Sequence, residues 1–155
     1  MSANILAADQ ILQETISKLE TALLVPSLAG EMGNWVREVK NAAATLATDW
    51  TRELNTVLHP QYEQISQTDP EMHSQVHNLT ECETALGAEL VQFHQKVHEL
   101  EQATSHIDWQ ESKLAAQQKA VEDAGLKLIL RMKKQQATAA TLLSEAVYRD
   151  RGVKD

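Results

Sequence analysis

A hydrophobic repeat between residues 72 and 100 is the feature that most restricts how this chain can fold. Its apolar side chains alternate steps of three and four residues, which places them on one stripe of an α-helix and matches the heptad spacing of packed helices. One slot of the repeat holds a carboxylate, Glu83. Because the stripe needs neighbouring helices to cover it, the sequence predicts a bundle. The apolar positions are Met72, Val76, Leu79, Leu86, Leu90, Phe93, Val97 and Leu100.

Three further segments have helical periodicity, and prolines, glycines and capping residues separate them. Pro26 and Gly30 end the first segment, and Pro60 is expected to kink or shorten the second. Asp69 and Pro70 open the third, as an N-cap and a first helical residue. The expected helices span residues 4–25, 31–66, 70–102 and 107–148, followed by a frayed tail at 150–155.

Length and composition agree with this pattern. The 155 residues include five glycines, three prolines and only 4% aromatic residues, which favours helix over sheet. We therefore expect one domain over residues 1–149: all-α, an elongated antiparallel up-down four-helix bundle with a short first helix. A second copy of the chain or a partner protein would cover what the short helix leaves exposed, so we expect a homodimer or a protein partner.

Charge and cysteine content narrow the functional classes. The net charge of -8 argues against nucleic-acid binding, which needs a basic surface. The single cysteine, Cys82, excludes an internal disulfide and a thiolate zinc cluster. The sequence contains neither a signal-peptide pattern nor an apolar run of ~20 residues, so we expect a cytoplasmic protein without membrane contact. Motifs for nucleotide phosphates and haem are absent as well, and no enzyme class is indicated.

Two His-xxx-His pairs, His73 with His77 and His94 with His98, lie three heptads apart beside the hydrophobic stripe. Their positions favour solvated surface imidazoles, although histidines four residues apart can chelate a transition metal. A metal would need further ligands, and each end of the bundle offers some. Those near the turn at Asp69 are His59, Glu63, His73, His77 and Glu81, and those near the next turn are His98, His106 and Asp108.

The segment HPQYE, residues 59–63, contains an HxxxE pair and precedes a helix that begins with proline. Together with residues 26–50, this layout resembles the divergent hemerythrin-like (HHE-type) bundles, and the resemblance covers about residues 26–100. It implies a transition metal, iron above all, held by histidines and carboxylates for sensing, storage or redox work. His59 and Glu63 match the HxxxE element, whereas the inward histidine of the next helix is replaced by Glu83. The fourth helix lacks an HxxxxD element.

Glu83 requires a partner if it faces inward, because a buried carboxylate is costly unless it is paired. Glu53 lies at nearly the same height on the second helix and Asp9 occupies a seam slot of the first, which predicts an acidic layer. Neighbouring residues offer an alternative, since Ala8, Leu54 and Cys82 could face inward instead. Lys127 or Arg131 could also neutralise Glu83, and Gly87 and Gly125 either leave room for the layer or mark close helix packing.

Two functions remain open on this sequence. In the first, a divergent hemerythrin-like bundle binds a transition metal through His59, Glu63, His77, Glu81 and Glu83, with His73, His94, His98 and His106 as second candidates. In the second, the protein is a metal-free helical adaptor or scaffold that acts through dimerisation or by binding a partner helix. The first accounts for six histidines between residues 59 and 106, and the second needs fewer special assumptions.

Overall fold

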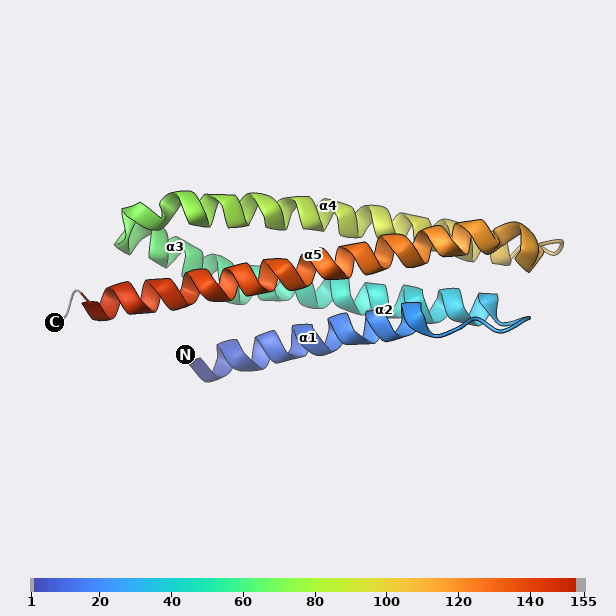
Figure 1. Cartoon of the computed structure of the whole chain (residues 1–155), viewed down its shortest axis with the longest axis horizontal. Helices are drawn as coiled ribbons and strands as arrows, with labels where there is room; N and C mark the ends of the chain where they lie inside the picture. The colour runs from blue at the N-terminus through green and yellow to red at the C-terminus, as the bar shows by residue number, and fades with distance from the viewer. Residues whose placement is uncertain (1, 153–155) are drawn as a thin grey trace.

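The structure, a computed structural model, describes the backbone of residues 2–152 and the side chains of residues 9–149. Within this range the chain is all-α and contains no strand. It forms four long helical stretches, as the sequence predicts, and α1 is the shortest (Figure 1). The elements are α1 (Ser2–Leu24), α2 (Met32–Glu53), a π-helical turn (Leu54–Leu58), α3 (His59–Thr68), a 3-10 turn (Pro70–Met72), α4 (His73–Thr104) and α5 (Glu111–Gly152).

The four stretches lie side by side along the long axis of the molecule (Figure 1). Helix α1 packs against α2 and α5, α2 also packs against α4, and α4 packs against α5. Because α1 is short, its N-terminus does not reach the end where α3 and the last turns of α5 lie. None of the described helices is both long enough and apolar enough to cross a membrane.

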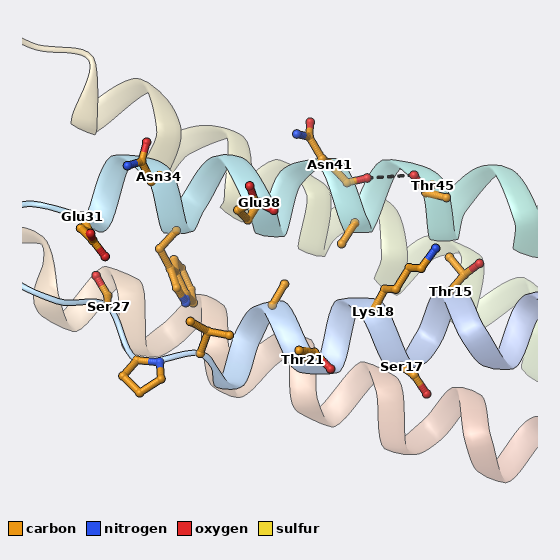
Figure 2. A pocket seen from close by; sticks show the side chains of 15 residues that line it. Thr15, Ser17, Lys18, Thr21, Ser27, Glu31, Asn34, Glu38, Asn41 and Thr45 are labelled. Carbon is orange, nitrogen blue, oxygen red and sulfur yellow. Dashed lines mark hydrogen bonds between the residues drawn. The ribbon is translucent and has the colours of Figure 1, made fainter.

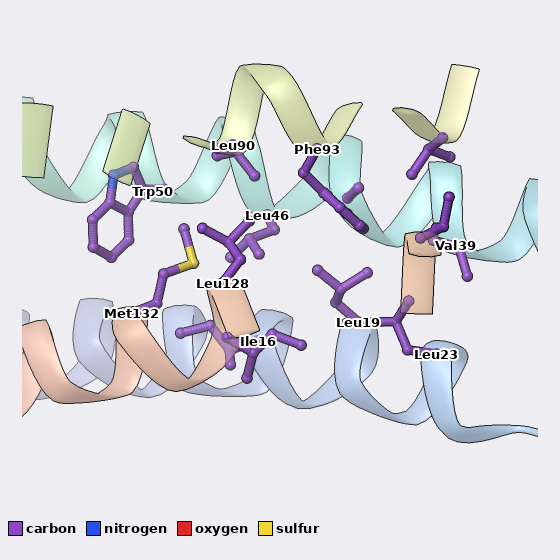
Figure 3. Close-up of a cluster of buried hydrophobic side chains, with 14 of the residues drawn as sticks. Ile16, Leu19, Leu23, Val39, Leu46, Trp50, Leu90, Phe93, Leu128 and Met132 are labelled. Carbon is purple, nitrogen blue, oxygen red and sulfur yellow. The ribbon is translucent and has the colours of Figure 1, made fainter. Parts of the chain in front are cut away.

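The predicted hydrophobic repeat of residues 72–100 is buried at all eight of its apolar positions. Most of them join a core to which α1, α2, α4 and α5 all contribute side chains (Figure 3). A smaller cluster lies at the end formed by α3, α4 and α5, where Tyr62 and Ile65 pack with Met72 and Leu142. Burial of these stripes is the main stabilising contribution in a fold of this kind.

Pro60 does not end the second helical stretch, which continues to Thr68. Its ring lacks an N–H group and would collide with the carbonyl of the preceding turn. The π-helical turn just before it relieves this conflict, and the His59 N–H donates to the carbonyl of Leu54, five residues earlier. The extra residue in that turn rotates all later side chains, so that Tyr62 and Ile65 are buried.

The observed helix limits differ slightly from the expected ones. The helix expected at 70–102 begins with a 3-10 turn, and the Asp69 carboxylate caps it by accepting a hydrogen bond from the Glu71 N–H at 3.2 Å. The helix expected at 107–148 begins later, at Glu111, and extends to Gly152. Residues 150–152 of the expected frayed tail are therefore helical, and 153–155 lie outside the described residues.

Candidate ligand site

Glu83 faces the interior and Cys82 faces solvent, which resolves the choice that the sequence left open. Only 2% of Glu83 is exposed. Its Oε1 accepts a hydrogen bond from the Tyr62 hydroxyl at 2.8 Å and lies 3.5 Å from the Gln135 amide nitrogen, and its Oε2 lies 3.3 Å from Nε2 of His59. These groups come from α3 and α5. Glu83 is thus held by polar partners from two neighbouring helices.

The partners of Glu83 are themselves fixed by their surroundings. The Gln135 amide also donates to the backbone carbonyl of Leu79 at 3.1 Å, which locks its orientation. Burial, together with the negative charge of Glu83 and the hydrogen bond to it, raises the pKa of the Tyr62 hydroxyl, so Tyr62 remains a neutral donor. His59 is different, since 43% of its side chain is exposed. It links the buried carboxylate to the surface.

Glu53 is the second buried carboxyl group of this region, and 7% of it is exposed. Among the described residues, its Oε2 atom has no hydrogen-bond partner. Burial, and after it the negative charges of Asp9 and Glu83, raises the pKa of Glu53 to about 7. At neutral pH the group is therefore divided between its acid and its carboxylate forms.

These carboxyl groups line one cavity of about 230 Å³, which is partly open to solvent. Asp9 from α1, Glu53 from α2 and Glu83 from α4 form its acidic side, while α5 contributes the amides of Gln135 and Gln136. Trp50 also lines it, and within the described part of the chain the indole Nε1 of this buried residue lacks an acceptor. The remaining walls are apolar: Leu12, Leu54, Val57, Leu58, Ala139, Ala140 and Leu143.

Asp9 is held in place by two glutamines. Its Oδ1 accepts from the Gln136 amide at 3.2 Å and its Oδ2 accepts from the Gln13 amide at 3.1 Å. Asp9, Glu53 and Glu83 therefore form the acidic layer that the seam positions suggested. The glycines do not create this space. A methyl group at Gly87 would meet nothing within 4 Å, and Gly125 packs against Leu23 and Phe93.

The other residues that the sequence proposed as ligands do not converge on the cavity. His77 Nε2 and a carboxylate oxygen of Glu81 lie 3.1 Å apart on the exposed face of α4. Glu63 and His73 are exposed as well, and they do not line the cavity. His94 and His98 are partly exposed further along α4, and His106 is exposed beyond its end. Of the proposed set, two pairs meet: His59 with Glu83 between two helices, and His77 with Glu81 on the surface of α4.

The side-chain partners of Glu83 in the described chain are His59, Tyr62 and Gln135 rather than Lys127 or Arg131. Arg131 forms an ion pair with Glu89 instead. Within the described range, no three histidine, cysteine, aspartate or glutamate side chains are grouped closely enough to hold a metal ion.

Sequence reasoning missed Tyr62, Gln135 and the polar role of Trp50. Gln135 had a visible signal, because it occupies the seam slot between Met132 and Ala139 just as Glu83 interrupts the seam of α4. Tyr62 had no such signal, since its burial depends on the π-helical turn. Trp50 is buried at a seam position, as expected, and its unpaired N–H appears only when the neighbours are known.

A second hollow of about 730 Å³ lies between α1 and α2. Figure 2 shows Lys18 and Thr21 of α1 on one side, and Asn34 and Glu38 of α2 on the other. Its walls are mainly apolar surface of the two helices. Neither unpaired buried atom, Nε1 of Trp50 or Oε2 of Glu53, belongs to its lining.

Comparisons with protein-family models, with curated proteins and with solved structures each give no match for this chain.

Proposed function

We propose that this protein is an antiparallel up-down four-helix bundle that acts as a binding protein, with its acidic cavity as the site for a cation. The observation that carries the proposal is the buried Glu53 carboxyl, whose Oε2 has no partner among the described residues. Burying a carboxyl costs free energy unless a hydrogen bond or a positive charge compensates it. Glu83 receives that compensation from three side chains, and Glu53 does not.

A bound cation would compensate Glu53 directly. The negative charge of the site suits a cation, because Asp9 and Glu83 lie close to Glu53. Repulsion among these carboxylates contributes to the raised pKa of Glu53. A positive ion would favour the ionised carboxylate and would reverse that shift. The cavity walls supply no competing ammonium or guanidinium group in the part of the chain that the structure describes. The function proposed here is binding rather than catalysis.

The test measures which cations stabilise the folded protein. Untagged protein is dialysed against a chelator, and its thermal unfolding is followed with Fe²⁺, Mn²⁺, Zn²⁺ and small primary ammonium salts. A ligand that binds only the folded state raises Tm. We expect at least one cation to raise the Tm of the wild type and to have a much smaller effect on Glu53→Gln.

Glu63→Gln is the matched control, because Glu63 is exposed and does not line the cavity. It removes the same negative charge from the same helical stretch, so it should respond to cations as the wild type does. If no cation stabilises the wild type more than Glu53→Gln, the proposed function is wrong, and the metal-free adaptor becomes the better hypothesis.

A further inference from the structure

We propose that the groove between α4 and α5 binds an amphipathic helix of a partner protein, and that this helix has acidic residues along one flank. The groove has a volume of about 710 Å³ and lies between two helices that pack against each other. The inference goes beyond the cation site and does not depend on it.

The two sides of the groove are regular stripes, one from each helix. Successive members of each stripe are three or four residues apart, so they share one face of their helix. Three nearly buried leucines, Leu79, Leu86 and Leu142, lie at its base. A groove between two such stripes is where a further helix packs in a bundle or a coiled coil. The stripe of α4 consists of Gln75, Asn78 and Cys82, and that of α5 of Arg131, Lys134, Thr138, Thr141 and Glu145.

The groove is long enough to hold a short helix. On α4 it extends from Gln75 to Leu86, a rise of about 17 Å at 1.5 Å per residue. A partner segment of about three helical turns has the same length. Such a helix would place one apolar side chain per turn in the groove, with a spacing of three or four residues.

The distribution of charge along the groove resembles that of a protein interface. Among the described residues that line it, the charged side chains lie toward the two ends, with Arg131 and Lys134 at one and Glu145 at the other. Threonine, alanine, asparagine and cysteine line the part between them. Protein interfaces are likewise poor in charge at the centre and polar at the rim. This pattern favours a protein partner.

The basic end of the groove determines the charge of the partner. Lys127, Arg131 and Lys134 follow one another at i, i+4 and i+7, so they form a row on one face of α5. Arg131 is paired with Glu89, but no carboxylate of the described residues forms an ion pair with Lys127 or Lys134. Acidic residues on the partner helix would supply the missing negative charge.

The groove between α1 and α2 is of similar size but of opposite charge. It has a volume of about 730 Å³, and its charged lining residues are Lys18, Glu31 and Glu38. The net charge of the whole chain is -8, so most of its surface repels an acidic segment. An acidic helix should therefore prefer the α4–α5 groove to the α1–α2 groove.

Cys82 provides the measurement, because it is the only cysteine of the chain, is exposed and lines the α4–α5 groove. Its rate of alkylation by iodoacetamide is followed in the full-length protein as a peptide is added. Two helical peptides of about 14 residues are compared, both with leucines at i, i+4, i+7 and i+11. One has glutamates along a flank, and the other has lysines there. The glutamate peptide should slow alkylation in a saturable manner, and the lysine peptide should bind roughly fivefold more weakly.

Lys134→Glu tests the basic end of the groove. Lys134 is exposed and has no ion pair among the described residues, so its replacement should leave the fold intact. The variant should bind the glutamate peptide roughly fivefold more weakly than the wild type. Lys18→Glu is the matched control, because it makes the same change of charge in the α1–α2 groove and should leave binding unchanged.

The comparison of the two peptides uses the wild type alone, so it does not depend on how well a variant folds. The inference is wrong if neither peptide protects Cys82, if both protect it equally, or if Lys18→Glu weakens binding as much as Lys134→Glu does. If the protein alone protects Cys82 as its concentration rises, and sediments as a dimer, a second copy occupies the groove and the inference is also wrong. None of these outcomes affects the cation test, which depends on Glu53→Gln.

Discussion

Two layers of the same helical assembly differ in how their interior is filled: one is tightly packed, and the other contains a cavity. Around Gly125 the side chains of Leu23 and Phe93 are so close that a methyl group at the glycine would lie 2.6 Å from Leu23 Cδ1. Around Glu53 the same kind of seam position holds carboxyl groups beside a cavity of about 230 Å³. Tight apolar packing in the first layer stabilises the fold, whereas the buried polar groups of the second layer lower its stability. This contrast is the reason for assigning binding to the second layer.

The largest expected effect comes from breaking the apolar layer. Leu19 is fully buried in the core shared by α1, α2, α4 and α5. Leu19→Ala should lower the free energy of unfolding by about 2–5 kcal/mol, because it loses buried area and leaves a cavity among tightly packed neighbours. Urea denaturation measures this change. Leu130→Ala is the control, since Leu130 is exposed on α5, and its effect should be small. A loss below about 1 kcal/mol for Leu19→Ala would contradict the tight packing.

The acidic layer should respond to pH in a direction opposite to that of an ordinary ion-paired carboxylate. The pKa of Glu53 rises from 4.5 to about 7 on folding, so the folded state holds a proton that the unfolded chain has released. The stability that this proton contributes is complete below pH 4.5 and is lost as the pH rises through 7. Such a shift corresponds to about 3 kcal/mol.

Urea denaturation of the wild type and of Glu53→Gln at several pH values isolates this contribution from other titrating groups. The stability of Glu53→Gln relative to the wild type should increase from pH 5 to pH 8. The same comparison with Glu63→Gln, at an exposed position, should give a difference that hardly changes over this range. A constant difference for Glu53→Gln would mean that Glu53 has an ordinary pKa.

A smaller effect is expected from the hydrogen bond that Tyr62 donates to Glu83. Tyr62→Phe removes the hydroxyl that lies 2.8 Å from the buried carboxylate, and it should lower the free energy of unfolding by about 2 kcal/mol. Tyr148→Phe is the control, because Tyr148 is exposed. Equal stability of the two variants in urea denaturation would show that Glu83 does not depend on this donor.

The smallest effects are expected from alanine substitutions at two glycines, one near each layer. Gly87→Ala should raise stability by about 0.5–1 kcal/mol, because alanine favours helix and a methyl group there meets nothing within 4 Å. Gly125→Ala gains the same helical preference but crowds Leu23 and Phe93, so we expect a net loss of about 1 kcal/mol. Thermal unfolding of both variants distinguishes them. A stabilised Gly125→Ala protein would show that this layer has room to adjust.

The local periodicity of the sequence determined the fold class, the helical stretches and the buried face of α4. The seam of residues 72–100 predicted which face of α4 is buried, and the same counting placed Glu83 in an interior slot and Asp69 at a helix start. The all-α class and the four helical stretches follow from patterns of three and four residues, because the geometry of a helix depends only on near neighbours. The acidic layer could also be proposed from sequence, since Asp9, Glu53 and Glu83 all occupy or adjoin seam slots.

Only the tertiary structure decided which groups meet. The π-helical turn before Pro60 adds a residue to its turn, and this rotation buries Tyr62 rather than the side chains that regular periodicity favours. The pairing of Glu83 with His59, Tyr62 and Gln135 depends on how far each helix is shifted along its neighbours, which heptad counting does not define. The exposed pair of His77 and Glu81 has ligand spacing but no third partner near it among the described residues. Spacing along a helix is local, whereas a site requires contacts between helices that lie far apart in the sequence.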